Sequence, residues 1–214
     1  MRPAGAREEE ASRRHFDRWR RVYSRSRLLG SLQRQALDDL DLRGDDRLLD
    51  VACGAGKLVR AVAPRVERAV GVDLSPGMIE DARRQSGDAD AADRIEFAVA
   101  PSDRLPFGDG EFTAIVTTTA FHHFPAPAAS AGEMARVLAP GGRILIGDLI
   151  RDTPPARLGD AFLRRFETGH VGLQDKAGFE GLLADAGIRV TRMRPVWLDL
   201  YALITGVKPP APAP

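Results

Sequence analysis

The stretch that decides the fold reads LLDVACGAGK at residues 48–57 and AVGVD at residues 69–73, with a short helical run between them. An apolar run ends in a glycine-bearing turn, a helix follows, and a second apolar run ends in Asp73. This order predicts half of a nucleotide-binding α/β unit, whose turn and helix N-terminus can receive a negatively charged or carboxylate-bearing ligand. An acid about 20 residues beyond such a turn is placed to accept hydrogen bonds from two ribose hydroxyls.

The glycines of this turn are Gly54 and Gly56. Having no Cβ, they allow a ligand to touch the backbone and they tolerate positive φ. Val59 stands where a dinucleotide fingerprint has its third glycine, and neither Tyr23 nor Tyr201 has a lysine four residues later. Both departures argue against a nicotinamide dehydrogenase. Taken by itself, the stretch is also compatible with an ordinary strand–turn–helix.

The composition is that of one globular domain, with 214 residues, 43% hydrophobic and 29% charged. No apolar run approaches the roughly 20 residues of a membrane span, and the arginine- and glutamate-rich N-terminus has no apolar signal core. The one cysteine, Cys53, excludes an internal disulfide, so a cytoplasmic protein is expected. No residues have the spacing of zinc ligands, so no metal site is expected.

The rest of the chain alternates apolar runs with helical patterns. Two helices are expected between about residue 8 and residue 39, before a first strand at 47–51. Further strands are expected at 67–72, 95–99, 112–118 and 143–149, the last entered by a tight turn at 140–142, and two more between 190 and 207 with a bend at Pro195. Helices are expected to separate the strands, including one capped by Ser75 and one capped by Asp175. This alternation predicts a Rossmann-like, doubly wound and mostly parallel α/β sheet, with ligands at the carboxyl ends of its strands.

Five segments of the chain together resemble the class I S-adenosylmethionine-dependent methyltransferases, in the small-molecule group related to quinone-biosynthesis C-methyltransferases. The segments follow one another in the family's order and lie at residues 48–57, 70–78, 105–112, 122–124 and 138–142. The resemblance implies a seven-stranded sheet with its last strand antiparallel, and S-adenosylmethionine as the cofactor. It also implies an N-terminal helical lid at 1–42, a cofactor-binding core at 43–149, a lid and acceptor-pocket insertion at 150–173, the C-terminal part of the core at 174–208, and a disordered tail at 209–214.

The resemblance further implies which residues bind the cofactor. The methionine end would lie against the turn and near Thr117, Asp73 would hold the ribose, Leu74 and Met78 would pack on the adenine, and Ser102 would meet its edge. The full set is Tyr23, Asp50, Ala52, Cys53, Gly54, Gly56, Asp73, Leu74, Met78, Ser102, Asp103 and Thr117. Two residues depart from the family pattern. Ala52 replaces the first glycine, which a negative φ there would allow, and Pro101 replaces an aspartate that accepts from the adenine amino group, so Ser102 or Asp103 is expected to compensate.

His122 and His123 follow the strand at 112–118 and are the candidates for a general base, because neutral imidazole is available near pH 7. A loop-supporting role for the pair is the alternative, and Asp148 and His170 are weaker candidates. The acceptor is expected to be a small, partly apolar metabolite, because no Asn/Asp-Pro-Pro-aromatic tetrad, paired glutamates or catechol-type magnesium site follows that strand.

Two other functions remain open. A methyltransferase fold can bind the cofactor without methyl transfer, as a partner subunit or in another reaction such as cyclisation. An RNA methyltransferase could use residues 1–34, which carry ten arginines against four acids. Phe16, Trp19 and Tyr23 share one helical face, however, which favours a lid over a nucleic-acid arm. A monomer or a homodimer is expected.

Overall fold

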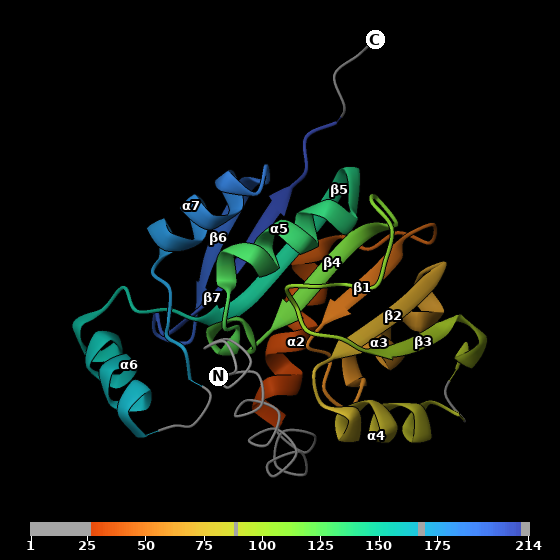
Figure 1. Ribbon diagram of the computed structural model, residues 1–214, viewed down its shortest axis with the longest axis horizontal. Coiled ribbons are helices and arrows are strands. Elements are labelled where there is room, and N and C mark those ends of the chain that lie inside the picture. The colour runs from red at the N-terminus through yellow and green to blue at the C-terminus, as the bar shows by residue number, and fades with distance from the viewer. Residues whose placement is uncertain (1–26, 88–89, 167–169, 211–214) are drawn as a thin grey trace, which may run out of the picture.

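The computed structural model describes residues 27–87, 90–166 and 170–210 (Figure 1). Their centre is a seven-stranded sheet in the order β3-β2-β1-β4-β5-β7-β6. Strands β1 to β5 pair in parallel, and β7 runs antiparallel to both of its neighbours, β5 and β6. The predicted seven-stranded, mostly parallel sheet with an antiparallel last strand is therefore confirmed. The strands are β1 Arg47–Val51, β2 Arg68–Asp73, β3 Ile95–Val99, β4 Phe112–Thr118, β5 Leu138–Leu149, β6 Arg189–Val196 and β7 Tyr201–Val207.

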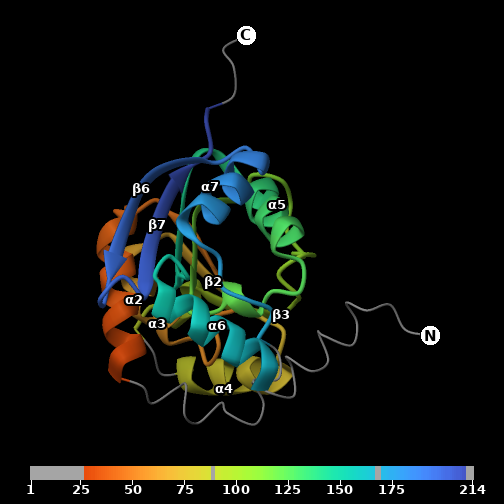
Figure 2. The ribbon, with the colours of Figure 1, turned by 90° about the vertical axis from the view of Figure 1, so that its left-hand side faces the viewer.

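Helices cover both faces of this sheet (Figure 2). Residues of α2, α3 and α4 pack in the core on one face, and residues of α5 and α7 pack in the core on the other. The helices are α2 Arg27–Leu40, α3 Lys57–Val62, α4 Pro76–Ser86, α5 Pro127–Val137, α6 Pro154–Phe166 and α7 Lys176–Asp185, with short 3-10 turns η1 Ala63–Arg65, η2 Ala92–Arg94 and η3 Phe121–His123.

The central strands supply both halves of the core. Leu49 and Ile115 belong to one buried cluster, whereas their sequence neighbours Leu48 and Val116 belong to the other. Successive side chains of a strand point to opposite faces, so a strand that is apolar throughout is buried on both. The run of such strands places their carboxyl ends side by side at one edge of the sheet, below β4 and β1 in Figure 1.

Several local expectations are confirmed. The bounds of β3 and β4 are those predicted, the Ser75 hydroxyl accepts from the Met78 N–H at the start of α4, and the Asp175 carboxylate accepts from the Gly178 N–H at the start of α7. Tyr23 and the first predicted helix lie outside the described residues, as do residues 1–7 and the end of the predicted tail.

Two expectations near the C-terminal half were wrong. The tight turn expected at residues 140–142 is part of β5, because Gly141 N–H donates to Lys208 O and Lys208 N–H donates to Gly142 O. The bend expected at Pro195 does not separate two strands: Pro195 lies inside β6 and pairs with Ala202. An edge strand tolerates a residue without an N–H, and the chain reverses at residues 197–200 instead.

Candidate functional site

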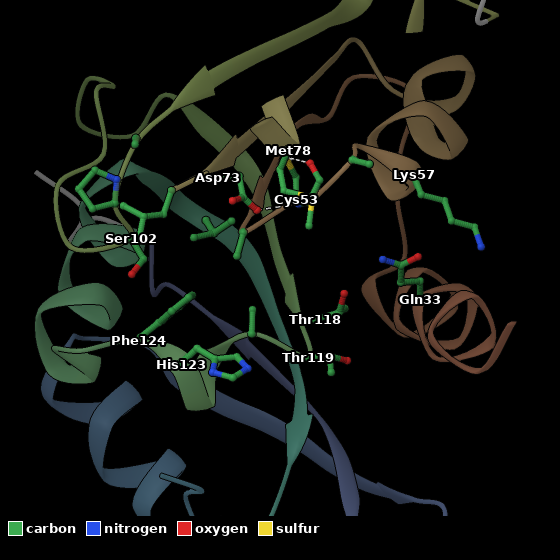
Figure 3. Close-up of a pocket in the computed structure, with 18 of the residues that line it drawn as sticks. Gln33, Cys53, Lys57, Asp73, Met78, Ser102, Thr118, Thr119, His123 and Phe124 are labelled. Atoms are coloured by element: carbon green, nitrogen blue, oxygen red, sulfur yellow. Dashed lines mark hydrogen bonds between the residues drawn. The ribbon is translucent and has the colours of Figure 1, made fainter. Parts of the chain in front are cut away.

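A cleft opens at the carboxyl ends of β1, β2 and β4 (Figure 3). Its volume is about 1260 Å³ when the solvent-filled space at its open mouth is included. In Figure 3, Asp73 and Cys53 face His123 and Phe124 across the opening. The residues that line it are Gly30, Gln33, Val51, Ala52, Cys53, Gly54, Ala55, Lys57, Arg60, Asp73, Leu74, Met78, Gln85, Ala100, Pro101, Ser102, Asp103, Thr118, Thr119, Ala120, His123, Phe124 and Pro125.

The glycine turn between β1 and α3 has left-handed backbone at three positions. The φ angle is 64° at Ala52, 54° at Gly54 and 72° at Gly56. The expectation of a negative φ at Ala52 is therefore wrong. A hydrogen bond to the neighbouring strand fixes the turn, because Cys53 N–H donates to Val72 O in β2 at 2.9 Å. This bond keeps Ala52 in the left-handed conformation, which alanine disfavours.

The two glycines of the turn have different surroundings. A Cβ on Gly54 would meet nothing within 4 Å, which fits a position where a ligand can approach the backbone. A Cβ on Gly56 would lie 2.6 Å from Cζ of Phe97 and 3.0 Å from Cβ of Ala82. Gly56 is thus required by the packing of α3 on the sheet, and Gly54 by access to the cleft.

Asp73 ends β2 with a carboxylate that the backbone holds in place. Its Oδ2 accepts from Gly54 N–H at 2.8 Å, and its Oδ1 accepts from Ser75 N–H at 2.9 Å. Each carboxylate oxygen has a second lone pair, so both can still accept from a ligand. Leu74 and Met78 line the cleft beside it and give this end an apolar wall.

Asp50 and Cys53 are buried at the base of the turn. Burial, together with the negative charge of Asp73, raises the pKa of the Asp50 carboxyl well above its usual range. Burial also raises the pKa of the Cys53 thiol, and the charges of Asp50 and Asp73 add to this effect. A thiol in such surroundings is a poor nucleophile, so Cys53 forms part of the wall of the cleft and takes no part in the chemistry.

The segment that follows β3 contains Pro101, Ser102 and Asp103, and all three residues line the cleft. The Ser102 hydroxyl is already paired with the Ser130 hydroxyl at 2.8 Å. Oδ1 of Asp103 is buried and has no hydrogen bond, and Nε of Arg104 lies 3.5 Å from it. The Asp103 side chain as a whole is 26% exposed, so part of its carboxylate is accessible at the cleft.

Three imidazoles gather at the opposite end of the cleft. The ring centroid of His122 lies 4.0 Å from that of His123 and 5.5 Å from that of His170. Only His123 lines the cleft. His122 is turned away from it, with Nδ1 2.6 Å from Oδ1 of Asp148 and its backbone N–H donating to Oδ2 of the same carboxylate.

His170 belongs to a second buried pair. Its Nε2 lies 2.8 Å from Oδ1 of Asp160 in α6, and this oxygen also accepts from Leu173 N–H. Burial by itself would raise the pKa of Asp160, but the hydrogen bonds from His170 and Leu173 and the charge of Arg164 hold it below its usual value. The pair fastens α6 beside the histidines. Within the described residues, no cluster of His, Cys, Asp or Glu could hold a metal ion.

The structure thus brings most of the predicted site residues together. Those that line the cleft are Ala52, Cys53, Gly54, Asp73, Leu74, Met78, Ser102, Asp103 and His123. Asp50, Gly56 and His122 lie behind this lining, and Thr117 is fully buried with no hydrogen bond at its hydroxyl.

Sequence reasoning missed Lys57 and Gln33, which stand at the α2 side of the cleft (Figure 3). A signal was present in Gly30, because glycine weakens a helix interior by about 1 kcal/mol. A Cβ at Gly30 would lie 2.6 Å from Nζ of Lys57, so this glycine makes room for the ammonium group.

The fold and the cleft together resemble those of class I S-adenosylmethionine-dependent methyltransferases. Residues 49–146 match the model of the methyltransferase domain family. S-Adenosylmethionine is the cofactor of that class, and the residues present fit it: a fixed acid after β2, an open backbone at Gly54, and the Asp103 carboxylate in the cleft lining.

Similar proteins support this assignment. The chain is 33% identical over 152 residues to 27-O-demethylrifamycin SV methyltransferase of Amycolatopsis mediterranei, covering 70% of this chain and 56% of that protein. It is 39% identical over 114 residues to demethylmenaquinone methyltransferase of Clavibacter sepedonicus, covering 53% and 44%. A methyltransferase solved in complex with the Trm112 activator of Haloferax volcanii superposes with a TM-score of 0.81 at 22% identity, covering 95% of this chain and all of that one. The chain spans about half the length of the first two proteins.

Proposed function

We propose that this protein transfers the methyl group of S-adenosylmethionine to a small, partly apolar metabolite. The observation that carries the proposal is one cleft with two unlike ends. One end has the fixed carboxylate of Asp73, and the other has the imidazole of His123 beside the apolar ring of Phe124. Such an arrangement can hold a nucleoside at one end and an acceptor at the other.

Each residue at the nucleoside end has a role in this proposal. Asp73 accepts from the two ribose hydroxyls, Leu74 and Met78 pack on the adenine, and the Asp103 carboxylate accepts from its amino group. This last contact replaces the aspartate that Pro101 removes. Ser102 is the weaker substitute, because its hydroxyl is already paired with Ser130. Lys57 and Arg60 are the cations that line the cleft, and they balance the carboxylate of the methionine.

The acceptor end works mainly by placement. S-Adenosylmethionine, when bound, supplies a methyl group already activated on a sulfonium. The protein therefore needs to hold the acceptor in line and exclude water, and the proposal needs no metal. His123 takes a proton if the acceptor must lose one. His122 is a positioning residue, because its contact with Asp148 fixes the loop that carries His123.

The division of the chain belongs to the same proposal. Residues 1–42 and 150–173 would enclose the acceptor, and residues 43–149 and 174–208 would form the core. The acting unit would be a monomer or a homodimer in the cytoplasm. In the described part of the chain, no helix is long and apolar enough to cross a membrane.

Calorimetry with S-adenosylhomocysteine tests the cofactor site. Asp73→Ala should weaken binding severely, since a hydrogen bond to a charged group contributes roughly 1.5–3 kcal/mol and two are lost. Asp73→Asn keeps the shape and separates loss of charge from collapse of the turn. Asp45→Ala is the matched control, because Asp45 is exposed in the turn before β1, whereas the cleft lies at the carboxyl end of β1. Unchanged affinity in a folded Asp73→Ala protein would sink the assignment.

A metabolite screen with labelled methyl donor tests the transfer itself. Products should gain one methylene unit in mass, and His123→Ala should reduce turnover while leaving the affinity for S-adenosylhomocysteine within a few fold. The contrary outcome is that the protein binds the cofactor but yields no labelled product with any apolar hydroxylated acceptor. The protein would then bind the cofactor without being a methyltransferase.

A further inference from the structure

The exposed apolar side chains of this protein are concentrated on two segments. Among the described residues, five large apolar side chains are exposed, and four of them lie on α6 or on the turn between β6 and β7. Leu158 is 75% exposed and Leu198 is 85% exposed. Scattered exposed leucines need no explanation, but a group of them on neighbouring segments marks an interaction surface.

Helix α6 is amphipathic, but two of its large apolar side chains face solvent and its acid faces the protein. The apolar residues Leu158 and Phe162 are exposed, whereas Asp160 is 4% exposed and carries the contact with His170. The hydrogen bonds of Asp160 turn its side of the helix inward.

The outer side of α6 is also positively charged. Arg157, Arg164 and Arg165 are exposed, and Asp160, the one acid in α6, is buried. An exposed apolar stripe bordered by arginines, with no exposed acid, is the pattern of a helix that lies in the interface of an anionic membrane.

The turn between β6 and β7 presents two more apolar side chains. Trp197, Leu198 and Asp199 have consecutive φ values of 52°, 57° and 58°, a left-handed run that non-glycine residues disfavour. The turn is nevertheless fixed: Leu200 N–H donates to Trp197 O, and Ile150 N–H donates to Leu200 O. In Figures 1 and 2 alike, this turn lies beside the beginning of α6.

The turn is connected to the cleft by one residue. Tyr201 begins β7 directly after the turn, and its hydroxyl lies 3.1 Å from Oγ1 of Thr119, which lines the cleft. The turn is therefore separated from the wall of the cleft by one buried side chain.

We propose that α6 and the β6–β7 turn form a docking surface for an anionic lipid bilayer, with Leu158, Trp197 and Leu198 inserted at the level of the headgroups. The exposed Arg157 pairs with a lipid phosphate, whereas Arg164 is paired with Asp160. A helix and a hairpin tip both project, which suits insertion into an interface better than it suits a protein partner's surface. That an acceptor enters from the bilayer rests on the proposed function, whereas the docking itself does not.

Trp197 supplies its own reporter. The chain has two tryptophans, so Trp19→Phe leaves Trp197 as the single tryptophan, whose emission can be excited apart from that of the tyrosines. On vesicles of phosphatidylcholine with phosphatidylglycerol, the emission of Trp197 should shift to the blue and be quenched by lipids brominated near the headgroup. Binding should be weaker on pure phosphatidylcholine and should fall as salt is raised.

Variants separate the apolar and the charged contributions. Leu158→Glu should weaken vesicle binding at least tenfold, the loss expected for an apolar side chain of this size, and Arg157→Gln about fivefold. Val99→Glu is the matched control, because Val99 is the fifth exposed apolar residue and lies on the distant edge strand β3. Cofactor affinity, measured by calorimetry, should be unchanged in all three variants. Vesicle binding therefore tests the docking, and calorimetry tests the cofactor site of the proposed function.

Three results would overturn the proposal. The first is no emission shift and no co-sedimentation with anionic vesicles. The second is equal binding to neutral vesicles, or equal loss in Val99→Glu and Leu158→Glu. The third is a blue shift of Trp197 that grows with protein concentration without lipid, which would make the surface an interface between two copies of the chain.

Discussion

Gly56→Ala should destabilise the fold by about 2–4 kcal/mol, whereas Gly54→Ala should cost about 1 kcal/mol. Both glycines have a left-handed φ, where an alanine destabilises the folded state by roughly 1–2 kcal/mol. Alanine also makes the unfolded chain less flexible, which offsets about 0.4–1 kcal/mol of this loss. Only at Gly56 does the new methyl enter occupied space, 2.6 Å from the ring of Phe97 and 3.0 Å from Ala82. Overpacking of this kind adds about 1–3 kcal/mol.

Urea unfolding of the two variants measures this difference directly, provided that the slope of free energy against urea stays that of the parent. Phe97→Leu combined with Gly56→Ala should recover part of the loss, because it removes the ring atoms nearest to the new methyl. Equal destabilisation by the two alanines, or no recovery in the double variant, would refute the close packing of Gly56 and the reasoning from it.

Two further predictions follow from the same region and from α6. Ala52→Gly should raise the free energy of unfolding by roughly 0.5–1 kcal/mol, because glycine adopts a left-handed φ without strain, although it also makes the unfolded chain more flexible. A lower urea midpoint for this variant would count against the φ of 64° at Ala52. Asp160→Asn should be less stable than the parent at pH 7, and the difference should shrink as the pH falls below the unfolded pKa of about 3.9 and through the lower folded pKa, because a carboxylate whose pKa is held low stabilises the fold only while it is ionised. A deficit independent of pH would show that ionisation of Asp160 is not its cause.

Sequence alone was sufficient where the signal is local. The bounds of β3 and β4 follow from short apolar runs between turns, and the cap of α7 follows from Asp175 three residues before Gly178. The antiparallel last strand came from resemblance to a family, because periodicity does not specify which strands pair.

The errors arose where distant residues decide the conformation. The φ of Ala52 is set by bonds from the turn to Val72 and Asp73 in β2. Likewise, the place of Lys57 in the cleft depends on Gly30 in another helix. None of these partners can be identified from the spacing of residues within one element.

The position of β7 has a consequence for how the protein is made. This strand lies between β5 and β6, with Arg143 opposite Val207 at one end of the pairing and Leu149 opposite Tyr201 at the other. Until residue 207 has left the ribosome, β5 is an open sheet edge and β6 has no neighbour to join. Open edges invite pairing with other chains, and synthesis of the roughly 60 residues between the end of β5 and the end of β7 takes on the order of several seconds at ordinary elongation rates.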